Sequence, residues 1–180
     1  MKGEDMKTLY IERSTGESRD GNWTNDLDLE GVGRIVVGTG PGSFAGIRAA
    51  LAFAQGFALG CACEVLGLPS ACALAGDGKI AVVGDARRGK MWIALFDGFT
   101  VEKEVFQVEE AALTANVPED HRVTTPDEKR IGTMLNECFG SRYLGGRTPT
   151  GEGLKRFAEA NPAALRPEPL PIYLNPAVRD

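Results

Sequence analysis

Apolar runs and glycine-rich breaks alternate along the first third of the chain. The β-branched run Arg34–Gly38 predicts a strand, and Leu9–Ile11 predicts a shorter strand before it. After a glycine loop, the apolar segment Ser43–Leu59 predicts a long helix that its first serine caps and that Gly60 ends. Glu64–Leu68 predicts the next strand. Strand, loop, helix and strand in this order indicate an α/β layer.

The middle of the chain changes to a strand-rich pattern. Two apolar runs, Lys79–Asp85 and Lys90–Asp97, are separated by the short turn Ala86–Gly89 and predict a β-hairpin. Phe99–Val108 predicts a third strand that extends the hairpin into a meander. Much later, Gly151–Ala160 predicts a helix.

This change of pattern places the boundary between two small lobes after residue 76. Residues 1–76 are expected to form an N-terminal α/β lobe, and residues 77–180 a C-terminal α/β lobe. Five prolines fall between Pro162 and Pro176, so we expect this tail to be extended along the surface.

The composition is that of an ordinary soluble protein, with 43% hydrophobic and 25% charged residues in a chain of 180. A formal net charge of -5 disfavours direct binding of nucleic acid, because Lys and Arg must neutralise the phosphates. The long apolar segment has 17 residues and contains Arg48 and Gln55, which argues against a membrane span. The four cysteines are Cys61, Cys63, Cys72 and Cys138. Their spacing predicts reduced thiols and a cytoplasmic protein.

The glycine loop within Gly38–Arg48 (GTGPGSFAGIR) is the most specific string in the chain. A Walker-type phosphate loop is excluded, because no lysine follows the closing glycine. Gly40, Gly42 and Gly46 form a dinucleotide-binding pattern that is one residue too long, with Glu64 as the acidic residue for the ribose. Glu64 begins its predicted strand and is therefore poorly placed for that role. The alternative is that the glycines make a tight turn and let the helix approach the sheet.

The helix after this loop has almost no polar face. Small residues recur three or four positions apart, at Ala45, Ala49, Ala52 and Gly56, and permit close approach of a second helix. A helix that is apolar all round must be covered all round. We therefore predict a helix-mediated protein interface, the alternative being burial of the helix under the second lobe.

The sole histidine, His121, limits the possible catalytic chemistry. A metal site of the His-pair type needs two imidazoles, and a Ser-His-Asp triad of the hydrolase type needs a G-x-S-x-G elbow that the sequence lacks. His121 lies in a polar loop, so we expect a solvated side chain and no protease activity. A soft-metal site at Cys61–Cys63 lacks a fourth ligand, and buried thiols are expected instead.

Two arginines occupy the predicted hairpin turn. Arg87 and Arg88 are suited to hold a phosphate or a carboxylate, and the alternative is a solvated turn. The acidic residues that follow predict a solvated face. They are Glu102, Glu104, Glu109 and Glu110.

Three motifs resemble the TsaB (YeaZ-type) family. Gly40–Arg48 reads GPGSFAGIR, which is similar to the family signature G-P-G-S-F-T-G-L-R. Asp85–Gly89 (DARRG) resembles the D-A-R-R turn of that family, and Pro169–Leu174 resembles its C-terminal E-P-x-Y-L-R segment. The three motifs occur in the family order.

The resemblance implies an actin/Hsp70-like (ASKHA) α/β fold with two RNase H-like lobes, the first of them truncated here. It also implies a role in threonylcarbamoylation of adenosine 37 in tRNAs that read ANN codons. In that family TsaB is not the catalyst. It pairs with the metal- and ATP-binding paralogue TsaD through the helix after the GPGSF loop, and the ATPase TsaE joins the pair. The same helices also allow homodimers.

The sequence departs from the family at its N-terminal end. Family members begin with a strand that carries I-D-T-S, whereas this chain has Glu12-Arg13-Ser14-Thr15. Arg13 is unsuited to a metal site, so ATP hydrolysis is not expected. Only 18 residues separate Thr15 from Arg34, where the family has a β-meander and a helix.

We therefore predict a non-catalytic accessory subunit that binds a TsaD-like and a TsaE-like protein and reaches tRNA only through them. No cofactor of its own is expected, and ATP is expected at the interface of the complex. The alternatives are a homodimeric interaction module outside the tRNA pathway and a small nucleotide-binding enzyme that uses the Gly40–Gly46 loop. The candidate nucleotide contacts are Gly40, Gly42, Arg87 and Arg88. The expected interface residues are Ser43, Phe44, Ile47, Arg48, Ala49, Ala52, Phe53 and Gly56.

Overall fold

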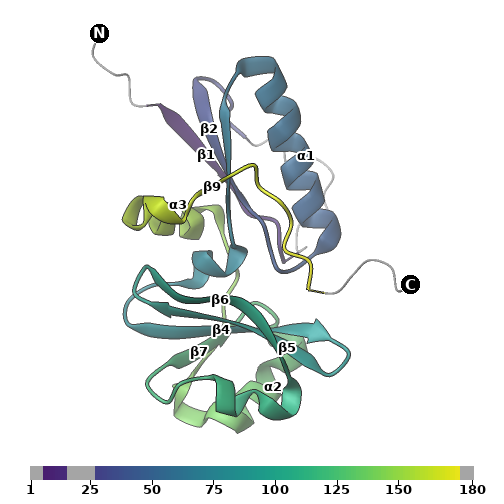
Figure 1. Cartoon of the computed structure of the whole chain (residues 1–180), viewed down its shortest axis with the longest axis vertical. Helices are drawn as coiled ribbons and strands as arrows, with labels where there is room; N and C mark the ends of the chain where they lie inside the picture. The colour runs from purple at the N-terminus through teal and green to yellow at the C-terminus, as the bar shows by residue number, and fades with distance from the viewer. Residues whose placement is uncertain (1–5, 16–26, 175–180) are drawn as a thin grey trace. The chain divides into compact units, whose positions relative to one another are not determined.

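The computed structural model describes residues 6–15 and 27–174, which form two compact units (Figure 1). Unit 1 contains the chain up to Ala73 and the later segment Thr150–Ile172. Unit 2 contains Leu74–Pro149 and the chain from Tyr173 onwards. Each unit has its own sheet and its own hydrophobic core.

Unit 1 is built on a sheet of four strands. The strands are β1 (Lys7–Ile11), β2 (Val32–Gly38), β3 (Glu64–Leu68) and β9 (Arg166–Pro167). They lie in the order β1-β2-β3-β9, with the first three parallel and β9 antiparallel to β3. Ile35, Val36 and Val37 are fully buried, because β2 is a central strand covered on both faces.

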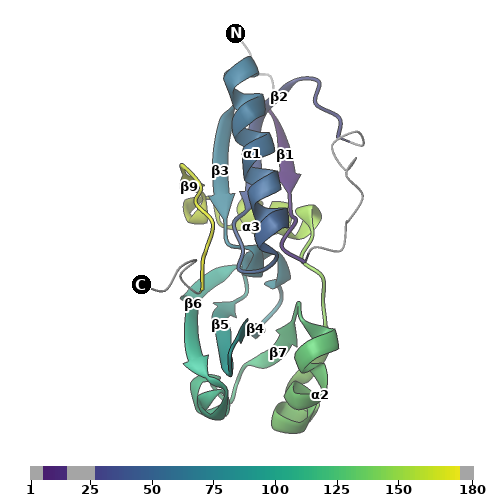
Figure 2. The same cartoon turned by 90° about the vertical axis from the view of Figure 1, so that its right-hand side faces the viewer.

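Two helices cover the faces of this sheet. Helix α1 (Phe44–Cys61) follows β2, and α3 (Gly151–Ala160) comes from the C-terminal part of the chain. Figures 1 and 2 show α1 on one face of the sheet and α3 on the other. α3 approaches closely through glycines: a Cβ at Gly153 would lie 2.3 Å from the carbonyl oxygen of Ala73.

Unit 2 is built on a sheet of five strands. The strands are β4 (Lys79–Arg87), β5 (Lys90–Asp97), β6 (Thr100–Glu109), β7 (Arg122–Thr125) and β8 (Tyr143–Gly146). They lie in the order β6-β5-β4-β7-β8. The first three form an antiparallel meander, β7 runs parallel to β4, and β8 runs parallel to β7. Helix α2 (Glu128–Phe139) connects β7 to β8 and buries Ile131 and Leu135 in the core of unit 2.

Short 3-10 turns connect the main elements at Ser70–Leu74, Glu110–Ala112, Thr114–Asn116, Gly140–Arg142 and Pro162–Ala164. The tail beyond the last of these turns is extended in its described part. β9 pairs with β3 there, and the N–H of Ile172 donates to the carbonyl of Thr39 over 2.8 Å. The predicted tail continues to Pro176, and its last two residues lie outside the described residues.

Most predicted elements are present, and two details of the predictions are wrong. The predicted strands, the hairpin, the meander, α1 and α3 are confirmed. Gly60 does not end α1, because the helix continues to Cys61 and Ala62 forms the left-handed C-cap with φ 52°. The division after residue 76 also differs from the structure, since Thr150–Ile172 belongs to unit 1.

Candidate functional site

Three backbone donors of the loop after β2 and the start of α1 are used within the chain. The N–H of Gly40 donates to the Ser70 hydroxyl over 2.9 Å, and the N–H of Ser43 donates to the carbonyl of Ser14 over 2.5 Å. Ser43 caps α1 as predicted, since its hydroxyl accepts from the N–H of Gly46. A phosphate-cradling loop needs free N–H groups that point at the ligand. The amides of Gly40, Ser43 and Gly46 are already in use.

Two glycines of this loop have a packing role. A Cβ at Gly42 would lie 2.3 Å from the carbonyl oxygen of Ser14, and a Cβ at Gly46 would lie 2.2 Å from that of Arg13. Real Cβ atoms do not approach backbone this closely, so the loop and the first turn of α1 can pack on the chain after β1 only with glycine there. The glycine spacing therefore fits the tight-turn interpretation.

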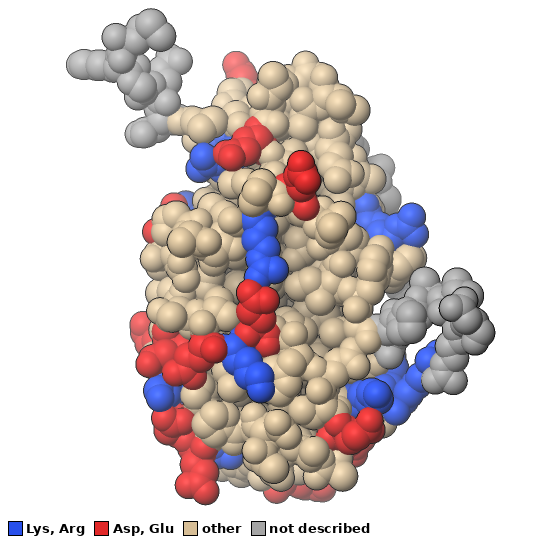
Figure 3. All heavy atoms as spheres, in the orientation of Figure 1, with Lys and Arg blue, Asp and Glu red and all other residues tan. Residues whose placement is uncertain are grey.

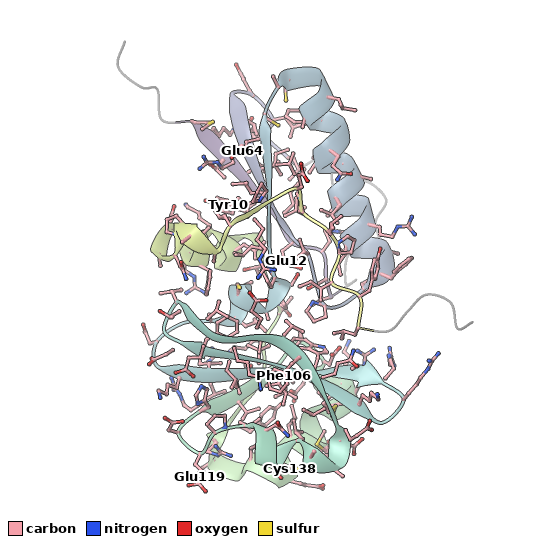
Figure 4. All side chains as sticks on the ribbon, in the orientation of Figure 1. Tyr10, Glu12, Glu64, Phe106, Glu119 and Cys138 are labelled. Carbon is pink, nitrogen blue, oxygen red and sulfur yellow. The ribbon has the colours of Figure 1, made fainter. Side chains whose placement is uncertain are left out.

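The acidic residue of the dinucleotide interpretation lies at the other end of the sheet. Glu64 begins β3 and pairs with Arg34, whose Nε lies 2.7 Å from a Glu64 carboxylate oxygen. Figure 4 shows Glu64 and Glu12 at opposite ends of the strands of unit 1. Glu64 is therefore remote from the loop that a dinucleotide pyrophosphate would occupy.

Glu12, directly after β1, is a carboxyl residue of unit 1 whose side chain is largely buried. One carboxyl oxygen accepts from the N–H of Ser14 over 2.6 Å, and the other is buried without a hydrogen-bond partner among the described residues. That oxygen would lie 1.9 Å from a Cβ at Gly38. Burial raises the pKa of Glu12, and hydrogen bonds from Ser14 oppose the rise. Desolvation therefore makes this carboxyl easier to protonate than an exposed glutamate.

The inner face of α1 packs on the sheet. Ile47, Ala50, Leu51 and Ala54 are buried there, at the three- and four-residue spacing of one helix face. The prediction that Ile47 lies at a partner interface is therefore wrong, because its side chain belongs to the core of unit 1. Phe53 and Phe57 are half-buried beside that core, with ring centroids 6.2 Å apart.

The outer face of α1 is exposed and mostly apolar. The small residues Ala45, Ala49, Ala52 and Gly56 lie exposed along it. Large apolar side chains stand at its two ends: Phe44 is 52% exposed and Leu59 is 91% exposed.

Two further residues complete this surface. Arg48 is exposed, and its guanidinium carbon lies 4.9 Å from the centroid of the Phe44 ring. The predicted interface omits Leu59, because the sequence argument follows the small residues only. Its place three residues after Gly56 is the signal that could have included it.

Length and composition also make α1 suitable for a membrane span. The helix has 18 residues, one more than the predicted segment, so its length alone does not exclude a span. Core helices of soluble proteins satisfy the same criterion. The four buried residues on the inner face show that α1 packs on a protein sheet.

His121 is not the solvated loop residue that its polar neighbours predict. It is only 1% exposed, and both ring nitrogens face carboxylates. Nε2 lies 2.8 Å from Glu102 and Nδ1 lies 2.9 Å from Asp120. Glu102 therefore contributes to a buried polar contact, whereas the sequence predicts that it belongs to a purely solvated face.

The cysteines and the two hairpin arginines differ in exposure. Cys63 and Cys72 are buried as predicted, whereas Cys61 and Cys138 are exposed, and all four are free thiols. Arg87 and Arg88 are exposed at the end of the β4–β5 hairpin. In the described residues no group of three or more His, Cys, Asp and Glu side chains is arranged to hold a metal ion.

Two solved structures from Pseudomonas aeruginosa are similar to this chain. One is described as an uncharacterized protein with similarity to peptidase YeaZ; it has a TM-score of 0.63 and 20% identity, and the match covers 84% of this chain and 78% of that one. The other is YeaZ, with a TM-score of 0.63 and 22% identity over 83% of this chain and 79% of that one. The curated proteins contain no match.

These matches show the fold class that was predicted, a YeaZ-type α/β fold of the actin-like (ASKHA) class. The family model of TsaD, described as tRNA N6-adenosine threonylcarbamoyltransferase, matches residues 24–120, which is more than half of the chain. The chain belongs to this family.

Proposed function

We propose that this chain is a TsaB-like accessory subunit in tRNA threonylcarbamoyladenosine formation and that it docks a TsaD-like partner through the outer face of α1. Family membership and the YeaZ-type fold support the pathway. The exposed apolar face of α1 is the observation that carries the docking role. A contiguous exposed apolar face of this kind marks a protein–protein interaction site in many soluble proteins.

The proposed partner is a TsaD-like protein that presents a helix of its own. Ala49, Ala52 and Gly56 bring the two backbones close, and Phe44 and Leu59 anchor the ends. The rest of the assembly follows from the same proposal: a TsaE-like ATPase joins the pair, and ATP binds at the interface of the complex. The net charge of -5 favours contact with tRNA through the partners.

A non-catalytic role fits the environments of Glu12 and His121. Glu12 is desolvated where ATP-binding relatives of the ASKHA class place an acidic metal-binding residue. Peptidase chemistry is disfavoured, because both ring nitrogens of His121 face carboxylates and neither faces a serine hydroxyl.

Small-nucleotide binding at the Gly40 loop is disfavoured by the occupied N–H groups of that loop. Calorimetry of the isolated chain with ATP and NAD tests this alternative. We expect no saturable heat with either compound. Saturable heat that Gly40→Ala abolishes would restore the small nucleotide-binding enzyme.

The docking role is tested with a buried charge. Ala52→Arg places a long cation in the middle of the outer face. A charge buried at an interface costs several kcal/mol, so we expect the dissociation constant for the host's TsaD to rise at least about 100-fold. Size-exclusion chromatography with light scattering and a titration by calorimetry measure it. Ala115→Arg, at an exposed position of unit 2, is the matched control and should leave binding unchanged.

The same experiment separates the docking role from the homodimer hypothesis. Wild-type affinity of Ala52→Arg for TsaD would remove α1 from the proposed interface. No binding of the wild-type chain to TsaD, together with a dimer that Ala52→Arg dissociates, would favour the homodimeric module.

A further inference from the structure

A second candidate site lies in unit 2, at the carboxyl ends of β4 and β7. The two strands are parallel neighbours, and the chain leaves them in opposite directions: β4 leads to β5 on one side, and β7 leads through α2 to β8 on the other. In open α/β sheets, ligands commonly bind outside the carboxyl ends of neighbouring parallel strands. The residues at this point are therefore candidates for a ligand site.

A polar network ties the two strand ends together. The N–H of Asp85, on β4, donates to a carboxylate oxygen of Asp127 over 2.9 Å. Arg130, on the first turn of α2, pairs with both carboxylates, and its Nε lies 3.2 Å from Asp85. The carboxylates are mostly buried, with Asp85 18% and Asp127 20% exposed, whereas Arg130 is 40% exposed. The network thus fixes one guanidinium at the surface.

Asp85 also holds the start of the hairpin turn. Its carboxylate accepts from the N–H of Arg87 over 2.7 Å, and it lies 3.5 Å from the Arg87 guanidinium. Two guanidinium groups, of Arg87 and Arg130, are therefore anchored on one carboxylate. Arg88 follows directly and is exposed, with no ion-pair partner among the described residues.

The backbone of this turn is strained at both arginines. Arg87 has φ 68° and Arg88 has φ 57°, in the left-handed region that residues with a Cβ rarely adopt. A two-residue turn of this kind favours Asn-Gly, yet this chain has Arg88-Gly89. Strain of this kind is found at functional sites, and here it presents two adjacent guanidinium groups at the end of the hairpin.

The three arginines differ in how far their charges are already paired. The guanidinium groups of Arg87 and Arg130 pair with the two carboxylates, whereas Arg88 is exposed without an ion-pair partner among the described residues. Figure 3 shows Lys and Arg atoms beside Asp and Glu atoms on the side of unit 2 where the hairpin ends. Guanidinium groups bind phosphate oxygens with paired, charge-assisted hydrogen bonds, and a phosphate offers enough acceptors for several of them at once.

We propose that Arg87, Arg88 and Arg130 form a phosphate-binding site at the carboxyl ends of β4 and β7, with Asp85 as the residue that positions it. The phosphate belongs either to an RNA backbone or to a free nucleotide. The site is distinct from the docking face of α1, and its existence does not depend on the proposed docking function.

The test follows the backbone amide signals of the full chain by NMR at low ionic strength. Inorganic phosphate, ATP and a short oligoribonucleotide are titrated separately. We expect shifts concentrated at Asp85 and at the hairpin turn around Arg88. A response to the oligoribonucleotide alone assigns the phosphate to RNA, and a response to ATP alone assigns it to a nucleotide; either supports the site. No saturable shift at the turn with any of the three probes overturns it.

Substitutions separate binding from general electrostatics. Arg88→Gln and Arg130→Gln should each weaken binding about tenfold, the loss of one charge-assisted hydrogen bond. Arg156→Gln, an exposed position on α3 of unit 1, removes the same charge and should change binding by less than about twofold. Equal effects of Arg88→Gln and Arg156→Gln would refute the site. Thermal melting of each variant checks that the fold is intact.

Asp85→Asn gives the sharpest outcome, because the two explanations predict opposite signs. Loss of a negative charge should tighten phosphate binding if only the local field matters. Loss of the anchor for Arg87 and Arg130 should weaken binding severalfold if Asp85 positions them, which is the result we expect. Tighter binding by this variant would remove the positioning role.

Discussion

At the scale of single residues, Glu12 and Asp120 show how differently two carboxyl groups of the same chain are placed. Glu12 lies beside Gly38, with one oxygen buried and without a partner among the described residues. Asp120 lies at the surface between Lys79 and His121, which both stabilise its charge. The first environment favours the neutral acid, and the second favours the carboxylate.

The buried carboxyl of Glu12 predicts a pH-dependent stability. Burial raises its pKa above the ordinary value of 4.5, so the folded chain keeps the proton over a pH range in which the unfolded chain has lost it. Stability is therefore highest below the unfolded pKa and falls as pH rises through the folded pKa. Glu12→Gln removes the ionisable group. The difference in free energy of unfolding between this variant and the wild-type chain should therefore favour the variant by about 1–3 kcal/mol more at pH 8 than at pH 4.5.

Urea denaturation of both proteins across this pH range measures the difference. Glu119→Gln makes the same substitution at an exposed position of unit 2 and serves as the matched control. The prediction would be contradicted if the free energies of unfolding of Glu12→Gln and the wild-type chain differed by the same amount at every pH.

Asp120 gives the opposite prediction. Hydrogen bonding to Lys79, and secondarily to His121, lowers the pKa of Asp120 to about 2. Lys79→Gln should therefore move the pKa of Asp120 back towards the ordinary value of 3.8. A carboxyl carbon NMR titration reads this directly. Lys129→Gln, on α2, removes an equal charge elsewhere on unit 2, and a matching rise in that variant would rule out the specific contact.

At the scale of elements, the two faces of α1 have clearly different roles. Its inner stripe fixes it on the sheet, and its outer stripe of small residues is exposed. The glycines of the helix follow the same division. Gly46 lies where the helix meets the backbone of Arg13, whereas nothing lies within 4 Å of a Cβ at Gly60.

This contrast predicts opposite effects of one substitution at two sites of α1. Gly46→Ala should destabilise the chain by about 1–3 kcal/mol, because the added methyl group meets the carbonyl oxygen of Arg13. Gly60→Ala should stabilise it by about 0.5–1 kcal/mol, because alanine loses less backbone entropy in a helix. Denaturant melts of the two variants decide, and equal changes in stability would contradict the packing role of Gly46.

The sequence predicts some elements well and others not at all. β2, α1 and the β4–β5 hairpin have strong apolar patterns, and Ser43 is a conventional helix cap, so local rules are sufficient there. The sequence-based prediction omits α2 and β8. Ile131, Met134, Leu135 and Phe139 follow the three- and four-residue spacing of one helix face, and this signal could have predicted α2, whereas β8 is only Tyr143–Gly146. The burial of His121 depends on Glu102, which is 19 residues away, and no local pattern reveals that contact.

The candidate site is predictable in outline only. The exposed small residues of α1 follow from their spacing, but the buried side of Ile47 depends on which helix face meets the sheet. The network at the carboxyl ends of β4 and β7 joins Asp85 to Asp127, 42 positions later in the chain, through the pairing of these strands. Such a pairing cannot be read from a single local pattern.

At the scale of the whole molecule, the fold of unit 1 includes a segment that lies far along the chain from its first strands. α3 and β9 follow unit 2 in the chain but belong to unit 1, and Leu154 and Phe157 are fully buried. The close approach of Gly151 to the carbonyl of Tyr10 fixes α3 against β1. Without this segment the sheet of unit 1 lacks the cover of one face and the edge strand beside β3.

A truncated chain tests this dependence. A protein that ends at Pro149 retains every helix and strand of unit 2 and lacks α3 and β9, so we expect the amide signals of unit 2 to keep their native dispersion. The signals of β1, β2 and β3 should collapse to unfolded positions. Native signals from these three strands would show that α3 is dispensable, and loss of both sets would show that the units fold together.

The late position of α3 in the chain also affects folding during synthesis on the ribosome. All of unit 2 up to Pro149 is translated before α3, so the sheet of unit 1 is made first yet must wait for its missing layer. During that interval the nascent polypeptide displays the uncovered side of β1 and β2. A chaperone that shields apolar strands during translation would therefore act on β1 and β2.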